Sequence, residues 1–312
     1  MLTRRRFLST LAAAGASSIA LCGYAFGVEP ILRLAITRHH LLPPGWPPGL
    51  HLRIAAIADL HACKPWMDRA RIREIVARTN ALQPDLVVLL GDYAAAHRWV
   101  RAPVPEAEWA ADLAGLKAPL GVHAILGNHD WWDDAEAQRS GRGPVLGRRA
   151  LEAAGIPVYE NDVVRLSKHG RPFWLAGLGD QIAFLPAQRR QRAPMRGVDD
   201  LPGTLAKITD DAPVILLAHE PDIFPRVPAR VALTLSGHTH GGQVRLFGYS
   251  PVVPSRYGNR YAYGHVVEPR ADGPRHLIVS GGLGCSIAPI RFGVPPEVLV
   301  VELGYDSATY PS

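Results

Sequence analysis

The sequence predicts an α/β fold in which two packed sheets are flanked by helices. Short runs of Val, Ile, Leu and Ala recur along the chain without polar alternation, which is typical of strands covered on both faces. Helical patterns separate the early runs, whereas the later runs follow one another after short turns. The expected strands are residues 52–58, 86–90, 122–126, 173–178, 214–218, 231–235, 277–279 and 298–301.

Residues 1–27 form the first predicted unit. Arg4, Arg5 and Arg6 precede 22 residues without charge, a pattern that resembles a twin-arginine signal for the export of folded proteins. The alternative is a plain amphipathic helix. No clean Ala-x-Ala cleavage site stands directly before Gly27, and the uncharged stretch is just long enough to span a bilayer, which favours a retained anchor over a cleaved signal. We therefore expect the twin-arginine export machinery as a partner, membrane association, and a body that is periplasmic or anchored facing outward.

Residues 28–50 lead into the main domain, which covers residues 51–312. We expect residues 28–42 to be extended, and the Pro- and Gly-rich run 43–49 excludes both a helix and a central strand, so that it forms a linker. Within the main domain, apolar residues at helical spacing predict a helix that includes residues 72–82 and stops at Pro84. Further helices are expected at 106–117 and 145–154.

Composition excludes several classes of protein. Of the 312 residues, 47% are hydrophobic and 20% are charged, which excludes a disordered scaffold, a collagen and a coiled coil. The net charge is +6, and Arg4, Arg5 and Arg6 supply half of it, so we expect no specific nucleic acid as a partner. The three cysteines lack Cys-x-x-Cys spacing, so a thiolate zinc site is not expected.

Polar clusters directly follow five of the predicted strands. They are Asp59-Leu60-His61, Gly91-Asp92, Gly127-Asn128-His129-Asp130, His219 and Gly237-His238-Thr239-His240. In an open α/β sheet, ligands bind at the carboxyl ends of the strands, so these clusters are expected at one edge. The glycines provide tight turns and allow a close approach of backbone to a ligand. A single histidine such as His123, His169 or His276 is more simply a hydrogen-bonded side chain, but chance does not produce all five clusters in this arrangement.

The clusters predict a metal site. Alternation along an extended segment would send Asp59 and His61 to the same side, and His238 and His240 likewise, so that each pair could bind one ion. Two ions with about four ligands each, one carboxylate being shared, would use every oxygen and nitrogen donor of the set. This set is Asp59, His61, Asp92, Asn128, His219, His238 and His240. Mixed donors favour Mn²⁺, Fe²⁺ or Zn²⁺ over Mg²⁺ or Ca²⁺, and the native ion stays open.

The clusters resemble the blocks D-x-H, G-D, G-N-H-[DE], H and G-H-x-H of the calcineurin-like metallophosphoesterase superfamily, from residue 52 to about 303. The resemblance implies a four-layer α/β/β/α sandwich that hydrolyses phosphoesters. It implies a first ion held by Asp59, His61, Asp92 and His240, and a second held by Asp92, Asn128, His219 and His238. It further implies that His129 is a catalytic histidine outside the ligand set, with Asp130 orienting it.

Two branches of this superfamily fit poorly. Protein serine/threonine phosphatases carry Gly-Asp-x-x-Asp-Arg-Gly, which residues 91–96 do not match, and purple acid phosphatases have a tyrosine where Ala95 stands. Residues 237–243 and 282–297 look instead like exported, often twin-arginine-targeted bacterial phosphodiesterases. Some relatives in that branch are UDP-2,3-diacylglucosamine pyrophosphatases, so a lipid-linked substrate of this kind is what the resemblance suggests.

Three functions follow as hypotheses. The first is a phosphodiesterase or pyrophosphatase that acts outside the cytoplasm on a lipid-linked or nucleotide-diphosphate substrate. The second is a broad phosphomonoesterase or nuclease that scavenges phosphate. The third is a non-catalytic, metal-stabilised binding module, against which His129 argues because metal binding does not need it.

Basic residues and cysteines raise two further questions. One basic stretch contains Arg139, Arg142, Arg148 and Arg149, and another contains Arg189, Arg190, Arg192 and Arg196. Each stretch is either solvated loop charge or a contact for anionic headgroups, with Trp131, Trp132 and Phe184 as apolar neighbours. Cys63 and Cys285 are expected to be reduced thiols that bind no metal, the alternative being a disulfide between them in an oxidising compartment.

Overall fold

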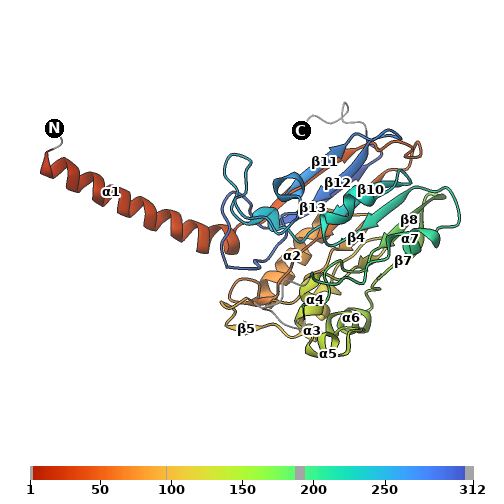
Figure 1. Cartoon of the computed structure of the whole chain (residues 1–312), viewed down its shortest axis with the longest axis horizontal. Coiled ribbons are helices and arrows are strands. Elements are labelled where there is room, and N and C mark those ends of the chain that lie inside the picture. The colour runs from red at the N-terminus through yellow and green to blue at the C-terminus, as the bar shows by residue number, and fades with distance from the viewer. Residues whose placement is uncertain (1–2, 96, 187–193, 306–312) are drawn as a thin grey trace.

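Figure 1 shows the computed structural model of the chain, which describes residues 3–95, 97–186 and 194–305. Two sheets pack together in the body, and the long helix α1 (Arg4–Gly23) projects from one end of it. The π-helical segment η1 (Tyr24–Leu32) continues α1 and joins it to the body.

The first sheet has the strand order β1-β13-β2-β4-β6. Its strands are β1 (Ala35–Leu41), β2 (Leu52–Ile57), β4 (Leu86–Leu89), β6 (Val122–Ala124) and β13 (Glu297–Leu303). Strands β2, β4 and β6 are parallel, so their carboxyl ends lie at the same edge. Strand β13 runs antiparallel to β2 and pairs with β1 on its other side.

The second sheet has the strand order β11-β12-β10-β9-β8-β7. Its strands are β7 (Asp162–Lys168), β8 (Arg171–Gly177), β9 (Val214–Leu217), β10 (Val231–Ser236), β11 (Gly264–Glu268) and β12 (Arg275–Val279). The four inner strands are parallel, whereas β7 and β11 are antiparallel edges. A small two-stranded pairing joins β3 (Cys63–Lys64) to β5 (Ala102–Pro103).

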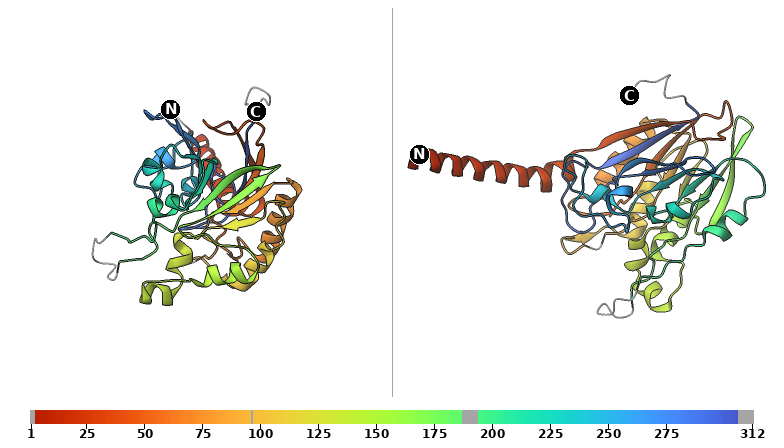
Figure 2. Two further views of the ribbon diagram at one scale, coloured as in Figure 1. Left: turned by 90° about the vertical axis from the view of Figure 1, so that its right-hand side faces the viewer. Right: turned by 45° about the horizontal axis from the view of Figure 1, so that its top comes forward.

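Helices cover the outer faces of both sheets. The first sheet is covered by α2 (Arg69–Ala81), α3 (Glu106–Leu113) and α6 (Leu146–Ala153), whose apolar residues share one core with it. The short helices α4 (Asn128–Trp132) and α5 (Ala135–Ser140) lie before α6 in the chain. The second sheet packs against α7 (Leu201–Ala206), η2 (Pro221–Arg226) and η4 (Gly258–Tyr261). Figure 2 (left) shows the orange helix α2 and the teal segments of the second sheet on opposite sides of the molecule.

The cores explain why the strand sequences do not alternate. On β2, Ile54 and Ala56 enter the core between the two sheets, whereas Ala55 and Ile57 enter the core beneath α2 and α3. A strand buried on both faces needs apolar residues at every position. The expected layers, with two sheets between helices, are confirmed, and each of the eight predicted strands is found.

Of residues 28–42, expected to be extended, 35–41 are extended and 28–32 are not, whereas residues 43–49 hold neither a helix nor a strand, as expected. Residues 24–32 are helical, and β1 adds a strand to the first sheet through parallel pairing with β13. Trp46 and Leu50 are buried in the core between the sheets. The sequence does not predict β1, because Thr37, Arg38 and the neighbouring polar residues interrupt the apolar run that indicates a buried strand. The edge strands β7 and β11 were also missed, since they too carry polar residues.

Candidate metal centre

The seven expected ligands converge where the carboxyl ends of the strands meet. Two follow β2, one follows β4, one follows β6, one follows β9 and two follow β10. Six of the seven are buried, and His238 is half-buried at the wall of a cavity. The structure therefore brings together every residue of the set Asp59, His61, Asp92, Asn128, His219, His238 and His240. Their assignment as ligands stays a prediction.

One group of donors is formed by Asp59, His61 and His240. His61 Nε2 lies 3.1 Å from His240 Nε2, and Asp59 Oδ1 lies 3.5 Å from His240 Nε2. The outer nitrogen of His61, Nδ1, lies 2.9 Å from the carbonyl oxygen of Ala94. Donation of the Nδ1 hydrogen to this oxygen leaves the lone pair of Nε2 directed at the group, as in metal-binding histidines.

A second group is formed by Asp92, His219 and His238. His219 Nε2 lies 3.2 Å from Asp92 Oδ2, and His238 Nδ1 lies 2.8 Å from Asn128 Oδ1. His219 Nδ1 faces the Leu90 carbonyl oxygen at 2.7 Å, which leaves Nε2 free to bind. Asp92 Oδ2 is also 3.6 Å from His61 Nε2, so this one oxygen lies between the two groups.

The electrostatics of the cluster favour a bound cation. Burial lowers the pKa of His61 to about 3, so this imidazole is neutral and able to coordinate. Burial raises the pKa of Asp59 to about 7, and its Oδ2 is buried without a hydrogen-bond partner among the described residues. Burial also disfavours a charged His219, but the Asp92 carboxylate outweighs it and holds the pKa of His219 well above its usual range. A proton on His219 thus occupies a place that a metal cation can take, and the donor set fits metal ions.

The backbone at the ligands is not the extended segment that the sequence suggested. Asp59, His61, Asp92, His238 and His240 all have positive φ, between 45° and 69°. Simple alternation is therefore the wrong reason for the convergence of each Asp-x-His or His-x-His pair. Each such residue costs on the order of 1–3 kcal/mol, and this strain is typical of functional sites. The rigid strands that precede these turns hold the side chains in place.

Gly127 makes room for the cluster. A Cβ at this position would lie 2.4 Å from Asp92 Oδ1 and 2.6 Å from His219 Cε1. We expect Gly127→Ala to weaken metal binding on the order of 100-fold, because it displaces two ligands together. Metal titration followed by isothermal calorimetry measures this loss. Gly27→Ala is the matched control, since a Cβ there meets no atom within 4 Å. Equal affinity in the two variants would contradict the packing argument.

His129 and Asp130 do not form the expected pair. His129 lines the cavity, and its Nδ1 lies 3.7 Å from Asp133 Oδ2. Both oxygens of Asp130 instead accept hydrogen bonds from backbone amides, those of Asp92, Tyr93 and Gly127, at 2.8–2.9 Å. Asp130 thus ties two ligand-bearing loops together, and Asp133 is the carboxylate that faces the His129 ring.

Arg291 and Gln243 are structural neighbours of the site that the sequence did not single out. The fully buried Arg291 donates to the carbonyl oxygens of Gly284 and Val294, and it lies 3.3 Å from His240 Nδ1. The Gln243 amide donates to the carbonyl oxygens of Ala288 and Ile290. The sequence signal for Arg291 is a single arginine inside an otherwise apolar segment near the C-terminus.

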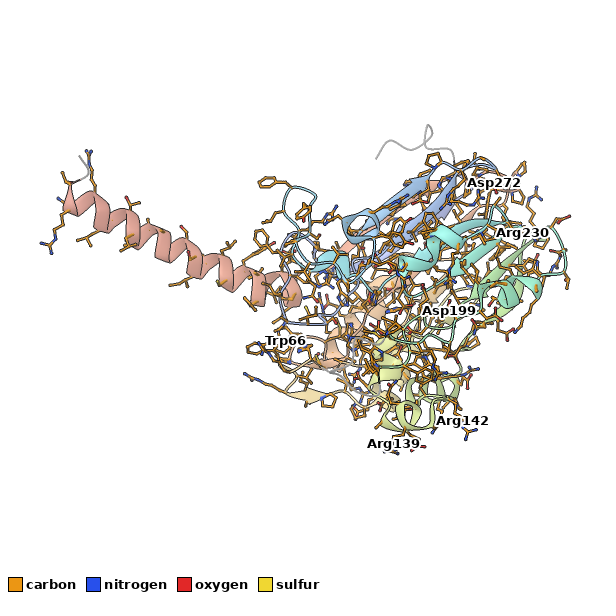
Figure 3. All side chains as sticks on the ribbon, viewed as in Figure 1. Trp66, Arg139, Arg142, Asp199, Arg230 and Asp272 are labelled. Atoms are coloured by element: carbon orange, nitrogen blue, oxygen red, sulfur yellow. The ribbon has the colours of Figure 1, made fainter. Side chains whose placement is uncertain are left out.

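Two of the four arginines in the basic stretch at 139–149 pair with acidic residues on the surface. Arg148 binds Glu152 and Glu160 at 2.8 and 3.0 Å, and Arg139 pairs with Glu136. Figure 3 shows Arg139 and Arg142 at the foot of the molecule, beside α5. Arg189, Arg190 and Arg192 lie outside the described residues, whereas Arg196 stacks on Phe184 at 4.4 Å.

The expectation that Cys63 and Cys285 are free thiols is confirmed, whereas the expectation that they bind no metal stays a prediction. Cys63 and Cys285 are free and buried, and burial raises the pKa of Cys63 to about 11. Both therefore stay thiols at neutral pH, and neither is part of the donor groups above.

Comparison with known proteins decides the family, because residues 52–242 match the calcineurin-like phosphoesterases. The chain belongs to the calcineurin-like phosphoesterase family. This phosphoesterase is 31% identical to the uncharacterized metallophosphoesterase YkuE of Bacillus subtilis, over 97% of this chain and 98% of that protein. It is likewise 31% identical to the phosphodiesterase YaeI of Escherichia coli, over 97% and 100% of the two chains.

A third relative is a transmembrane protein with a metallophosphoesterase domain from Danio rerio, 31% identical over 62% of this chain and 41% of that protein. The family and these relatives make this phosphoesterase a metal-dependent phosphoester hydrolase.

Proposed function

We propose that the protein is a dinuclear phosphodiesterase or pyrophosphatase that acts outside the cytoplasm. Its substrate is lipid-linked or a nucleotide diphosphate, such as UDP-2,3-diacylglucosamine, as in the exported branch of the superfamily. The single observation that carries the two-ion assignment is Asp92 Oδ2, which lies 3.6 Å from a nitrogen of one donor group and 3.2 Å from a nitrogen of the other. Mn²⁺, Fe²⁺ and Zn²⁺ fit the nitrogen and oxygen donors best.

The chain's own residues supply the rest of the chemistry. Divalent ions at the two donor groups would polarise the phosphoryl oxygens and make a water acidic enough to attack at neutral pH. His129 lies in the wall of the same cavity as Asp92 and Asn128, where it can protonate the leaving oxygen. Asp133 Oδ2 faces the other ring nitrogen of His129, Nδ1, at 3.7 Å.

A comparison of four substrates tests this proposal. The metal-reconstituted protein is given bis-p-nitrophenyl phosphate, p-nitrophenyl phosphate, nucleic acid and UDP-2,3-diacylglucosamine. We expect the diester and the pyrophosphate to be cleaved with the highest kcat/KM. Preference for the monoester or for nucleic acid would favour the phosphate-scavenging hypothesis. If no substrate is turned over, the hypothesis of a non-catalytic binding module is favoured instead.

Export and anchoring of the protein are part of the proposal. Residues 4–32 form a helix long and apolar enough to cross a membrane, with a mean hydropathy of 1.6 over its most apolar 18 residues, although a signal sequence passes the same test. Its 20-residue first part, α1, measures about 30 Å, the thickness of the hydrocarbon core. Arginines at its N-terminal end favour a cytoplasmic N-terminus, so that the body lies outside.

Replacing Arg4 and Arg5 together by Lys is expected to block export, because the twin-arginine route reads this pair. Cell fractionation of the double variant measures the effect, and Arg6→Lys is the matched control at the adjacent arginine. If the double variant is exported normally, the twin-arginine assignment is wrong. Extraction of the exported wild-type protein by alkaline carbonate would show that the helix is not a retained anchor.

A further inference from the structure

The cavity at the metal centre has two chemically distinct parts. It encloses about 450 Å³, and Asp92, Asn128, His238 and His240 line one part of it. The remaining wall is mainly apolar and is built by Trp132, Val244, Val252, Ile287, Ala288 and Ile290. A phosphoester bound at the donors therefore has its substituent against an apolar surface.

The polar side chains of this wall are already engaged. Gln243 binds Ala288, Ile290 and the Ser286 amide, and Thr239 donates to the Ala262 carbonyl oxygen. Ser286 Oγ lies 3.3 Å from His129 Nε2. The described lining contains no Lys or Arg. Such a wall offers little to a nucleobase or a second phosphate, whereas it suits a hydrocarbon chain.

Exposed apolar side chains lie in the two segments that wall the cavity, where Val252 and Ile287 line it and residues 246–249 follow the lining residue Val244. We name Leu246, Phe247, Tyr249, Val252 and Ile287 the apolar rim; their exposed fractions run from 48% for Leu246 to complete exposure for Phe247. The turn at 246–249 is closed by two backbone hydrogen bonds of 2.9 Å between Leu246 and Tyr249, which leaves Phe247 at its tip. Residues 246–254 include no charged side chain. A group of exposed apolar residues of this kind marks an interaction surface.

The loop that walls the cavity also holds the foot of the N-terminal helix. The Arg291 amide donates to the Ala25 carbonyl oxygen at 2.9 Å, and the rings of Tyr24 and Phe292 meet at 5.9 Å. The buried Glu29 accepts a hydrogen bond from the Val294 amide. Backbone hydrogen bonds of the parallel β-bridge type join Phe292 to residues 243–245, which lead directly into the turn at 246–249.

The figures show the same arrangement. In Figure 1 and in Figure 2 (right), the blue loops that follow β10 and β12 gather at the end of the body from which α1 projects. Phe26 and Leu32, at the foot of the helix, are also exposed, by 46% and 70%. A bilayer that α1 crosses would therefore meet the apolar rim as well.

We propose that the apolar rim inserts into the surface of the bilayer that α1 crosses, and that the cavity takes its substrate from that bilayer. The substrate class is a membrane lipid phosphoester, with its phosphate at the metal donors and its hydrocarbon chain against Val252, Ile287 and Ile290. This inference rests on the proposed function, and it selects the lipid-linked substrates over the nucleotide alternatives.

Membrane insertion is tested by lipid-dependent quenching in the full chain. In a Cys22→Ser background, a bimane label is placed at Phe247→Cys and, as the matched control, at Asp272→Cys. Figure 3 shows Asp272 at the end of the body away from α1. In phosphatidylcholine vesicles with nitroxide-labelled acyl chains, we expect quenching of the label at 247 but not at 272. An unquenched label at 247 would overturn the insertion.

The chain subsite is tested with chromogenic diesters that share one leaving group, the methyl, octyl and dodecyl p-nitrophenyl phosphates, each below its micelle concentration. Hydrolysis breaks the bond from phosphorus to the nitrophenolate oxygen, water supplies the new oxygen, and the released proton goes to solvent. We expect kcat/KM to rise at least about tenfold from methyl to dodecyl, since each buried methylene is worth up to about fourfold.

The variant Ile287→Ser is expected to reduce the dodecyl-to-methyl ratio of kcat/KM towards one, whereas Val267→Ser, at another exposed apolar position on β11, keeps the ratio. Equal kcat/KM for all three chain lengths in the wild-type protein would overturn the lipid subsite while leaving the phosphodiesterase intact. Failure to cleave even the methyl ester would instead contradict the proposed function.

Discussion

Replacing Asp92 by Asn is expected to lower kcat/KM for bis-p-nitrophenyl phosphate on the order of 10⁴-fold and to remove at least one of two bound metal ions. The reason is that Asp92 Oδ2 faces both donor groups, at 3.2 Å from His219 Nε2 and 3.6 Å from His61 Nε2. An amide group cannot supply the negative charge that a shared ligand needs. The Asn side chain can still accept the His129 amide through Oδ1, so the loop should keep its conformation.

Metal content by mass spectrometry and kcat/KM are measured on the same preparation of this variant. Asp272→Asn is the matched control, because the exposed Asp272 pairs with Arg275 at the start of β12, the opposite end of the sheet from the polar clusters. A protein that keeps two ions and loses less than tenfold in kcat/KM on Asp92→Asn would show that this carboxylate is not shared.

Replacing His129 by Ala is expected to lower kcat by about 10²–10⁴-fold while metal content stays unchanged. Its ring lies 4.9 Å from that of His61 and lines the cavity, so it can reach a leaving group. A general acid matters most when the leaving group is basic. We therefore expect a larger loss for a phenyl diester than for the p-nitrophenyl diester, whose leaving oxygen needs little help.

The His129 experiment also decides a geometric ambiguity. One nitrogen of His129 lies within 4.8 Å of donor atoms of His61 and Asp92, so the geometry alone permits a third ligand there. Loss of metal from the variant would assign His129 as a ligand. An equal loss for both leaving groups would contradict the acid role. His169→Asn, in the exposed turn between β7 and β8, is the control for a histidine outside the site.

The site was predictable from the sequence because its information is local. Each cluster stands directly after an apolar strand, so the strand itself predicts which edge receives residues such as Asp92 and His219. The four-layer packing was predictable from runs such as residues 52–58, in which apolar and polar residues do not alternate, because this pattern indicates a strand buried on both faces. The order of the clusters also matched one family, which the comparison with known proteins confirmed.

The sequence was less informative about how the ligands are held. Alternation along the chain was expected to align Asp59 with His61, but both residues have positive φ. Turns of this kind are stabilised by hydrogen bonds from elsewhere in the chain, as when Asp59 Oδ1 accepts the His238 amide. The same limit explains Asp130, whose partners are backbone amides on the loop after β4 as well as on its own loop.

The sequence by itself determined the buried strands, the polar clusters that follow them and the family, because each rests on residues that are neighbours in the chain. Only the tertiary structure decided that β1 joins the first sheet, that Asp133 faces His129, and that the foot of α1 lies beside the mouth of the metal cavity. Contacts such as Arg291 with Ala25 join segments more than 200 residues apart. No local pattern encodes such pairings, because they depend on how the packed sheets bring distant loops to one edge.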